Sequence, residues 1–229
     1  MDTAQKYSIS TSEFSQCLIY SNLSVDARVS DIKLTCLDAI KFGIPRILVN
    51  AVNISMATEF CANSHVKVGA ALSYPIGAYP PEIKGLEIED ANNNGADEIF
   101  MLMALGTFLD GFYDKIEEEM NTLIDNANNK PSYYMIETTA LNDEQLFNIC
   151  NLAKNSGIES IITCTNFKQG GYPTATIEQV SYLVECSDAM IDIVACGDIE
   201  ESDHAIEFLH AGASRICTPY AVELIKEVT

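Results

Sequence analysis

The sequence predicts an α/β fold, a (β/α)8 TIM barrel formed by a single domain over residues 1–229. Short apolar runs typical of strands alternate with amphipathic segments of helical spacing. Seven or eight such pairs fit into 229 residues, and no linker or change in composition divides them. A doubly wound open sheet is the main alternative. It is disfavoured because no G-x-G-x-x-G motif follows the first strand.

The predicted strands are short and rich in β-branched, aromatic and other apolar residues. Seven of them are clear, and a weaker candidate precedes these near the start of the chain. In chain order, the eight segments are 16–20, 46–49, 66–72, 98–105, 133–137, 160–165, 190–195 and 214–218.

Helices are predicted between the strands, where apolar residues recur on one face. Prolines open the segment 80–94, as they do in a first helical turn, and Asn142 is placed to cap the segment 142–155. Glycines such as Gly43 and Gly157 follow helical segments and predict left-handed helix ends. The predicted helices are 30–42, 80–94, 114–127, 142–155, 176–186 and 202–210.

Charge and composition exclude several classes of function. The 33 acidic residues face 13 lysines and arginines, and the net charge of -20 disfavours partners such as nucleic acid or an anionic membrane. There is no apolar run long enough to span a bilayer, and the start lacks a secretory signal, so a cytoplasmic protein is expected. The eight cysteines form no CxxC pair, which indicates reduced thiols; we expect no metal and no cofactor.

Several turns and junctions carry a family resemblance. A PIGA turn at 75–78, a GADEI junction at 95–99 and AGASRI at 211–216 stand in order along the chain. They resemble the deoxyribose-phosphate aldolase family, in which these segments read PLGA, GADEI and AGATRI. The resemblance covers roughly residues 16–221. It implies a TIM barrel and a carbon–carbon lyase that forms a Schiff base on lysine.

The differences from this family occur at the positions of its catalytic residues. Its two active-site strands read VKTSTGF and VKASGG, whereas this chain has IITCTNF at 161–167 and IVACG at 193–197. The lysine that forms the Schiff base is replaced by Ile162, and the lysine that perturbs its pKa by Val194. The acid of the family's DEIDM segment is replaced by Phe100. Alkyl and aryl side chains have no amine to condense with a carbonyl.

The loops that hold phosphate in the family are also altered. The GTSSG loop corresponds here to residues 217–221, where Pro219 has no backbone N–H to donate. The GGIRT loop corresponds to 197–201, and its Asp198, Glu200 and Glu201 would repel a phosphate dianion. These changes predict that the chain does not cleave deoxyribose phosphate.

The candidate site residues lie at the carboxyl ends of predicted strands, where barrel active sites form. Glu137 and Lys168 are tentative catalytic residues; the alternatives are a glutamate that braces the barrel mouth and an exposed loop lysine. Asp198 is a candidate for a polyol or a cation, or else a solvated turn residue. The predicted ligand-binding residues are Thr163, Thr165, Asn166, Gly170, Gly171, Gly197 and Asp198.

Two functions of different class remain open. The first is a pseudo-aldolase without Schiff-base activity that binds a small-molecule ligand or serves as a regulatory subunit, in a homo-oligomer or in a hetero-oligomer with an active homologue. The second is a lyase, aldolase or isomerase with altered chemistry on a small unphosphorylated carbonyl or polyol. In that case Glu137 is the base, and Lys168 or Asp198 orients the ligand.

Overall fold

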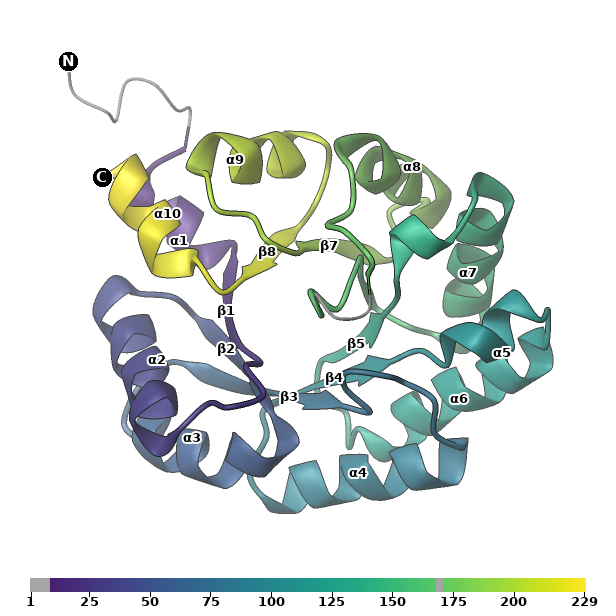
Figure 1. Ribbon diagram of the computed structural model, residues 1–229, viewed down its shortest axis with the longest axis horizontal. Coiled ribbons are helices and arrows are strands. Elements are labelled where there is room, and N and C mark those ends of the chain that lie inside the picture. Colours follow the sequence, from purple (N-terminus) through teal and green to yellow (C-terminus); the bar gives the residue numbers. More distant parts are fainter. Residues whose placement is uncertain (1–8, 168–170) are drawn as a thin grey trace.

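A closed barrel of eight parallel strands organises the computed structural model, which describes residues 9–167 and 171–229 (Figure 1). Each strand pairs with its neighbour in the sequence, and the first pairs with the last. The predicted TIM barrel is therefore confirmed. The strands are β1 (Leu18–Asn22), β2 (Arg46–Asn50), β3 (Lys67–Leu72), β4 (Glu98–Leu102), β5 (Ser132–Met135), β6 (Ser160–Ile162), β7 (Asp192–Cys196) and β8 (Arg215–Thr218).

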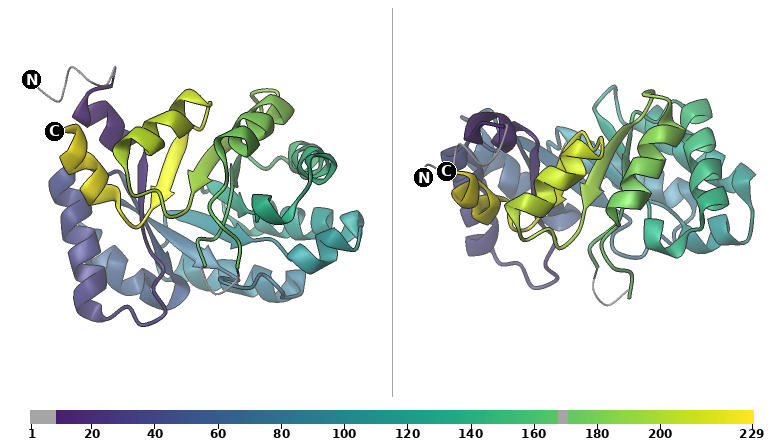
Figure 2. Two further views of the ribbon diagram at one scale, coloured as in Figure 1. Left: turned by 45° about the horizontal axis from the view of Figure 1, so that its top comes forward. Right: turned by 90° about the horizontal axis from the view of Figure 1, so that it is seen from above.

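Helices surround the barrel on its outer side (Figure 1), and two further views show the molecule tilted and from the side (Figure 2). Helices α1 and α10 lie side by side, where the Thr11 hydroxyl donates to the Val228 carbonyl at 3.4 Å. The helices are α1 (Thr11–Gln16), α2 (Val29–Phe42), α3 (Ile54–Cys61), α4 (Pro81–Asn93), α5 (Leu105–Leu109), α6 (Tyr113–Asn126), α7 (Asp143–Ser156), α8 (Ile177–Ser187), α9 (Ser202–His210) and α10 (Ala221–Val228).

The ends of several helices follow the sequence signals. The Asn142 side chain accepts from the Gln145 N–H at 2.9 Å and caps α7, as predicted. Gly43 and Gly157 end α2 and α7 with φ of 69° and 76°, in the left-handed region. Pro81 stands in the first turn of α4.

Other boundaries differ from the prediction. Strand β4 ends at Leu102 rather than at 105, because Leu105 begins the short helix α5. Strand β6 ends at Ile162 rather than at 165, since the chain turns away toward Asn166, whose φ is 56°. Helices α1, α3, α5 and α10 were not predicted. Helix α5 has five residues, LGTFL, which are too few to show a helical period.

Two apolar clusters form the core. The larger one lies between the barrel and the helices. The smaller one fills the barrel interior, and its buried members are Ile19, Leu48, Ala71, Phe100, Leu102, Tyr133, Met135, Ile162, Cys164, Val194, Cys196 and Cys217. Below it, at the amino-terminal end of the strands, the Arg46 Nε lies 2.9 Å from a Glu98 carboxylate oxygen. The interior is thus solid below the mouth, and open space is found at the carboxyl-terminal end.

Within the described ranges, no helix combines the length and the apolar character that crossing a membrane requires. All eight cysteines lie in those ranges and carry free thiols.

Candidate functional site

Apolar side chains occupy the middle of the barrel. Ile162 on β6 and Val194 on β7 are register partners, and both are fully buried. Phe100 on β4 stacks on Tyr133 of β5, with ring centroids 4.0 Å apart and planes within 6°. The Phe100 ring reaches across β3, where a Cβ on Gly69 would lie 2.5 Å from its Cε2. These contacts leave no room for solvent at this level of the barrel.

A layer of thiols lies above this hydrocarbon. Cys196 is the register partner of Cys217, and the Cys164 thiol donates to the Cys196 carbonyl at 2.7 Å. Hydrogen bonds with the Cys164 and Cys217 thiols, together with burial, raise the pKa of Cys196 well above its ordinary value. Cys196 is therefore a protonated packing group rather than a nucleophile.

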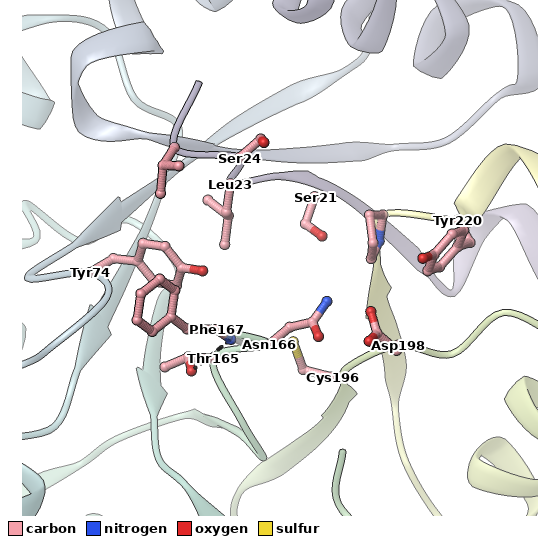
Figure 3. Close-up of a pocket in the computed structure, with 12 residues that line it drawn as sticks. Ser21, Leu23, Ser24, Tyr74, Thr165, Asn166, Phe167, Cys196, Asp198 and Tyr220 are labelled. Atoms are coloured by element: carbon pink, nitrogen blue, oxygen red, sulfur yellow. Dashed lines mark hydrogen bonds between the residues drawn. The ribbon is translucent and has the colours of Figure 1, made fainter. Parts of the chain in front are cut away.

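A cavity of about 270 Å³ opens at the mouth, on the carboxyl side of the strands (Figure 3). We call it the axial cavity. Tyr74 and Phe167 meet edge to face on one side of it, with centroids 6.2 Å apart, and Asp198 lies on the other side, near Tyr220. Its lining comprises Ser21, Leu23, Ser24, Val25, Tyr74, Thr165, Asn166, Phe167, Cys196, Asp198, Pro219 and Tyr220.

The charge of the axial cavity is set by one acid. Among the lining residues that the structure describes, Asp198 supplies the carboxyl group, and none is a lysine, arginine or histidine. Its backbone N–H donates to the Thr174 hydroxyl at 3.0 Å, so this donor is directed to the protein. Pro219 has no N–H. The described residues place a carboxylate and no basic side chain beside an anionic phosphate, which disfavours phosphate binding.

A second cavity of about 180 Å³ adjoins the first and shares Thr165 and Phe167 with it. We call it the side cavity. Apolar side chains form most of its walls, and Glu137, which follows β5, supplies its single carboxyl group. The lining comprises Pro75, Ile76, Leu102, Met103, Leu105, Glu137, Thr165, Phe167 and Tyr172.

The hydrogen bonds that Glu137 accepts from described residues reach one of its two carboxyl oxygens. The Thr165 hydroxyl and the Thr165 backbone N–H both donate to Oε1, the latter at 3.2 Å. The Phe167 N–H in turn donates to the Thr165 hydroxyl oxygen at 3.2 Å. The other carboxyl oxygen, Oε2, is buried and has no hydrogen-bond partner within 9–167 and 171–229, and the residue is 6% exposed. Burial raises the pKa of Glu137, while the hydrogen bonds from Thr165 oppose this shift.

The structure brings Glu137, Thr165, Asn166 and Asp198 to the mouth, where the sequence predicted ligand-binding or catalytic residues. Gly171 lies in a shallow adjoining pocket with Asp198. The predictions for Lys168 and Gly170 fall outside the described residues.

Two predicted ligand-binding residues lie behind the cavities. Thr163 is fully buried, and its hydroxyl accepts from the Cys196 N–H at 3.0 Å, which ties β6 to β7. Gly197 lacks a Cβ where one would overlap the Thr174 side chain, and its φ is 148°. It allows Thr174 to approach and so positions Asp198.

Several lining residues were not predicted from the sequence. Tyr74 lies two residues after the end of β3, before the PIGA turn, and Ser21 lies on β1. Tyr172 and Tyr220 come from the loops after β6 and β8. Their positions after strand ends were the available signal. Among the described residues, no group of three or more histidine, cysteine or acidic side chains is arranged to hold a metal ion.

Sequence comparison places the chain among known proteins. No protein-family model matches it. A deoxyribose-phosphate aldolase from Caldicellulosiruptor saccharolyticus is 31% identical over 218 residues, which cover 94% of this chain and 98% of that protein. The chain belongs to the deoxyribose-phosphate aldolase family. The family resemblance of the turns and junctions is thereby confirmed. A second deoxyribose-phosphate aldolase, from Thermococcus gammatolerans, is 31% identical over 211 residues.

Solved structures agree on the architecture of this family member. The tetrameric deoxyribose phosphate aldolase from Aeropyrum pernix superposes with a TM-score of 0.89 at 18% identity. The match covers 98% of this chain and 94% of that chain. At this identity the likeness concerns the fold, and the chemistry of the site has to be argued from its residues.

Proposed function

We propose that this protein is a deoxyribose-phosphate aldolase family member without Schiff-base activity, which binds a small unphosphorylated molecule at its barrel mouth. The observation that carries the proposal is the apolar filling of the barrel by Phe100, Ile162 and Val194. In the expected alignment, these positions hold the acid and both lysines of the family. A Schiff base requires an amine, and these side chains have none.

The position of the lysines supports the same proposal. None of the described lysines lines the axial or the side cavity. The fully buried lysine, Lys84, lies outside the barrel on α4 and is paired with Glu119 on α6. The Lys84 amine is held by this ion pair and by its hydrogen bond to the Leu102 carbonyl, away from both cavities.

The alternative is an enzyme that acts without a Schiff base, and one observation favours it. Glu137 is a buried carboxyl group at a strand end, and its pKa is raised, as in many general bases and acids. A lyase or isomerase would place a carbonyl or polyol substrate within hydrogen-bonding distance of Glu137. Turnover of an unphosphorylated substrate that is lost in Glu137→Gln would support this alternative.

The proposed binding function is compatible with an oligomer. The Aeropyrum pernix relative is tetrameric, and this supports self-association of the present chain. A mixed assembly with an active family member would fit a regulatory subunit equally well. Pull-down of a co-expressed active homologue, compared with self-association measured by light scattering, distinguishes the two arrangements.

A turnover assay tests the proposal. With deoxyribose 5-phosphate as substrate, we expect no aldehyde release above the rate without protein. An active family member measured in parallel is the positive control, and its rate sets the sensitivity of the assay. Cleavage by the wild-type chain at a rate comparable with that of the control would contradict the proposal.

A further inference from the structure

The side cavity contains an unsatisfied acceptor. Buried carboxylate oxygens in folded proteins nearly always accept hydrogen bonds. At Glu137, the two donors of Thr165 both reach Oε1, while Oε2 is buried and has no partner among the described residues. Oε2 belongs to a residue that lines the cavity, so the missing donor is expected to come from a molecule bound there.

The residues that line the side cavity indicate the size and the apolar character of such a molecule. Apart from Glu137 and the Thr165 and Tyr172 side chains, the lining consists of Pro75, Ile76, Leu102, Met103, Leu105 and Phe167. Apolar walls favour a hydrocarbon body. An apolar cavity of roughly 150 Å³ holds benzene, and the side cavity measures about 180 Å³. A ligand with a short alkyl chain or a single ring and one polar end therefore fits.

The charged groups around the side cavity indicate which polar group the ligand carries. Among the described residues that line the cavity none is basic, so an anionic ligand would meet Glu137 without a compensating cation from this part of the chain. A neutral hydroxyl would satisfy Oε2, but it would leave the carboxylate charge unpaired. An ammonium group satisfies both the hydrogen bond and the charge. Phe167 and Tyr172 contribute aromatic rings to the lining, a residue type that favours a nearby cation.

We infer that the side cavity binds a small primary amine in its ammonium form, with the nitrogen donating to Glu137 Oε2 and the hydrocarbon body against Leu102, Met103 and Phe167. The inference rests on the proposed binding function and names its ligand class. The titratable groups that face Glu137 in the described part of the chain are the phenols of Tyr74 and Tyr172. Burial raises the pKa of the Tyr74 phenol further above physiological pH, so we expect Glu137 to govern the pH dependence of binding.

Calorimetric titration with benzylamine tests the inference on the full chain. Benzyl alcohol and benzoate are the neutral and anionic counterparts, and we expect both to bind at least about tenfold more weakly than benzylamine. Glu137→Gln keeps the shape and removes the charge, so it is expected to weaken benzylamine binding by a similar factor. Glu117→Gln removes an exposed acid on α6 and is expected to leave the affinity unchanged. Equal affinity for the amine and the alcohol would overturn the inference.

The pH dependence provides a test that needs no variant. Benzylamine stays protonated between about pH 7 and about pH 5, whereas Glu137 has a raised pKa in the free protein. An ammonium partner favours the carboxylate, so binding releases a proton and the affinity falls as the pH is lowered. Affinity that rises on acidification would show that the protonated carboxyl binds the ligand, and would refute an ammonium site.

The two proposals fail in different ways. If benzylamine does not bind and deoxyribose 5-phosphate is not cleaved, the ammonium site is wrong and the proposed loss of Schiff-base activity stands. If deoxyribose 5-phosphate is cleaved, the proposed function is wrong whatever the side cavity binds.

Discussion

Replacing Lys84 by methionine is expected to lower the free energy of unfolding by about 3–5 kcal/mol. The Lys84 Nζ lies 2.8 Å from Glu119 Oε2 and donates to the Leu102 carbonyl at 2.6 Å. Both side chains are buried, at 0% and 2% exposure. Methionine leaves the Glu119 carboxyl group without its counter-charge in a site where burial already raises its pKa. Urea denaturation followed by circular dichroism measures the loss.

A second substitution separates the charge from the packing. Glu119 Oε1 accepts from the Tyr134 hydroxyl at 2.7 Å and from the Ala104 N–H at 3.2 Å. In the double variant Lys84→Met/Glu119→Gln, the amide oxygen keeps these donors and the unpaired charge is gone. We expect the double variant to recover most of the lost stability. A double variant less stable than Lys84→Met would show that the loss came from packing alone.

Replacing Phe100 by alanine is expected to lower the free energy of unfolding by about 3–5 kcal/mol. The ring is fully buried and stacks on Tyr133 in the barrel interior. Alanine removes this contact and leaves a cavity that the rigid strands cannot close. The same denaturation measurement applies. A loss below about 1 kcal/mol would mean that the interior relaxes or holds water, contrary to a well-packed barrel.

Gly69 provides the control for Phe100. A Cβ at this position would approach the Phe100 ring to 2.5 Å, so Gly69→Ala is expected to destabilise the wild-type protein. In the Phe100→Ala background the ring is absent, and the added methyl group should be tolerated better. A double-mutant cycle measures this coupling. Equal effects of Gly69→Ala in both backgrounds would show that the two residues do not contact each other.

The order of strands and helices could be predicted because each βα unit carries its own periodicity and turn residues. Helix α7 is an example, with Asn142 at its start and Gly157 at its end. Helix α5 could not be predicted, because its five residues continue the apolar run of β4. Only tertiary packing decides where the strand stops and the helix begins.

The candidate site was predictable where a residue follows a strand directly. Glu137 and Asp198 were found in this way, since parallel strands bring their carboxyl ends to one face. Thr163 lies behind the cavity because successive side chains along a strand point to opposite sides. Ile162 points into the barrel, so the next residue points away from it. The partners of Glu137 depend on how the loop after β6 folds back, which the sequence pattern does not specify. The unsatisfied Oε2 is accordingly a finding of the structure.

Reductive trapping tests most directly whether an amine nucleophile stands in the barrel. The protein is incubated with an aldehyde and then with borohydride, and the modified lysines are mapped by mass spectrometry beside an active family member. We expect only slow, scattered modification of surface lysines, as in a sample without catalytic activity. Rapid, stoichiometric modification of one lysine, Lys168 included, would contradict a barrel in which Ile162 and Val194 have replaced the amines.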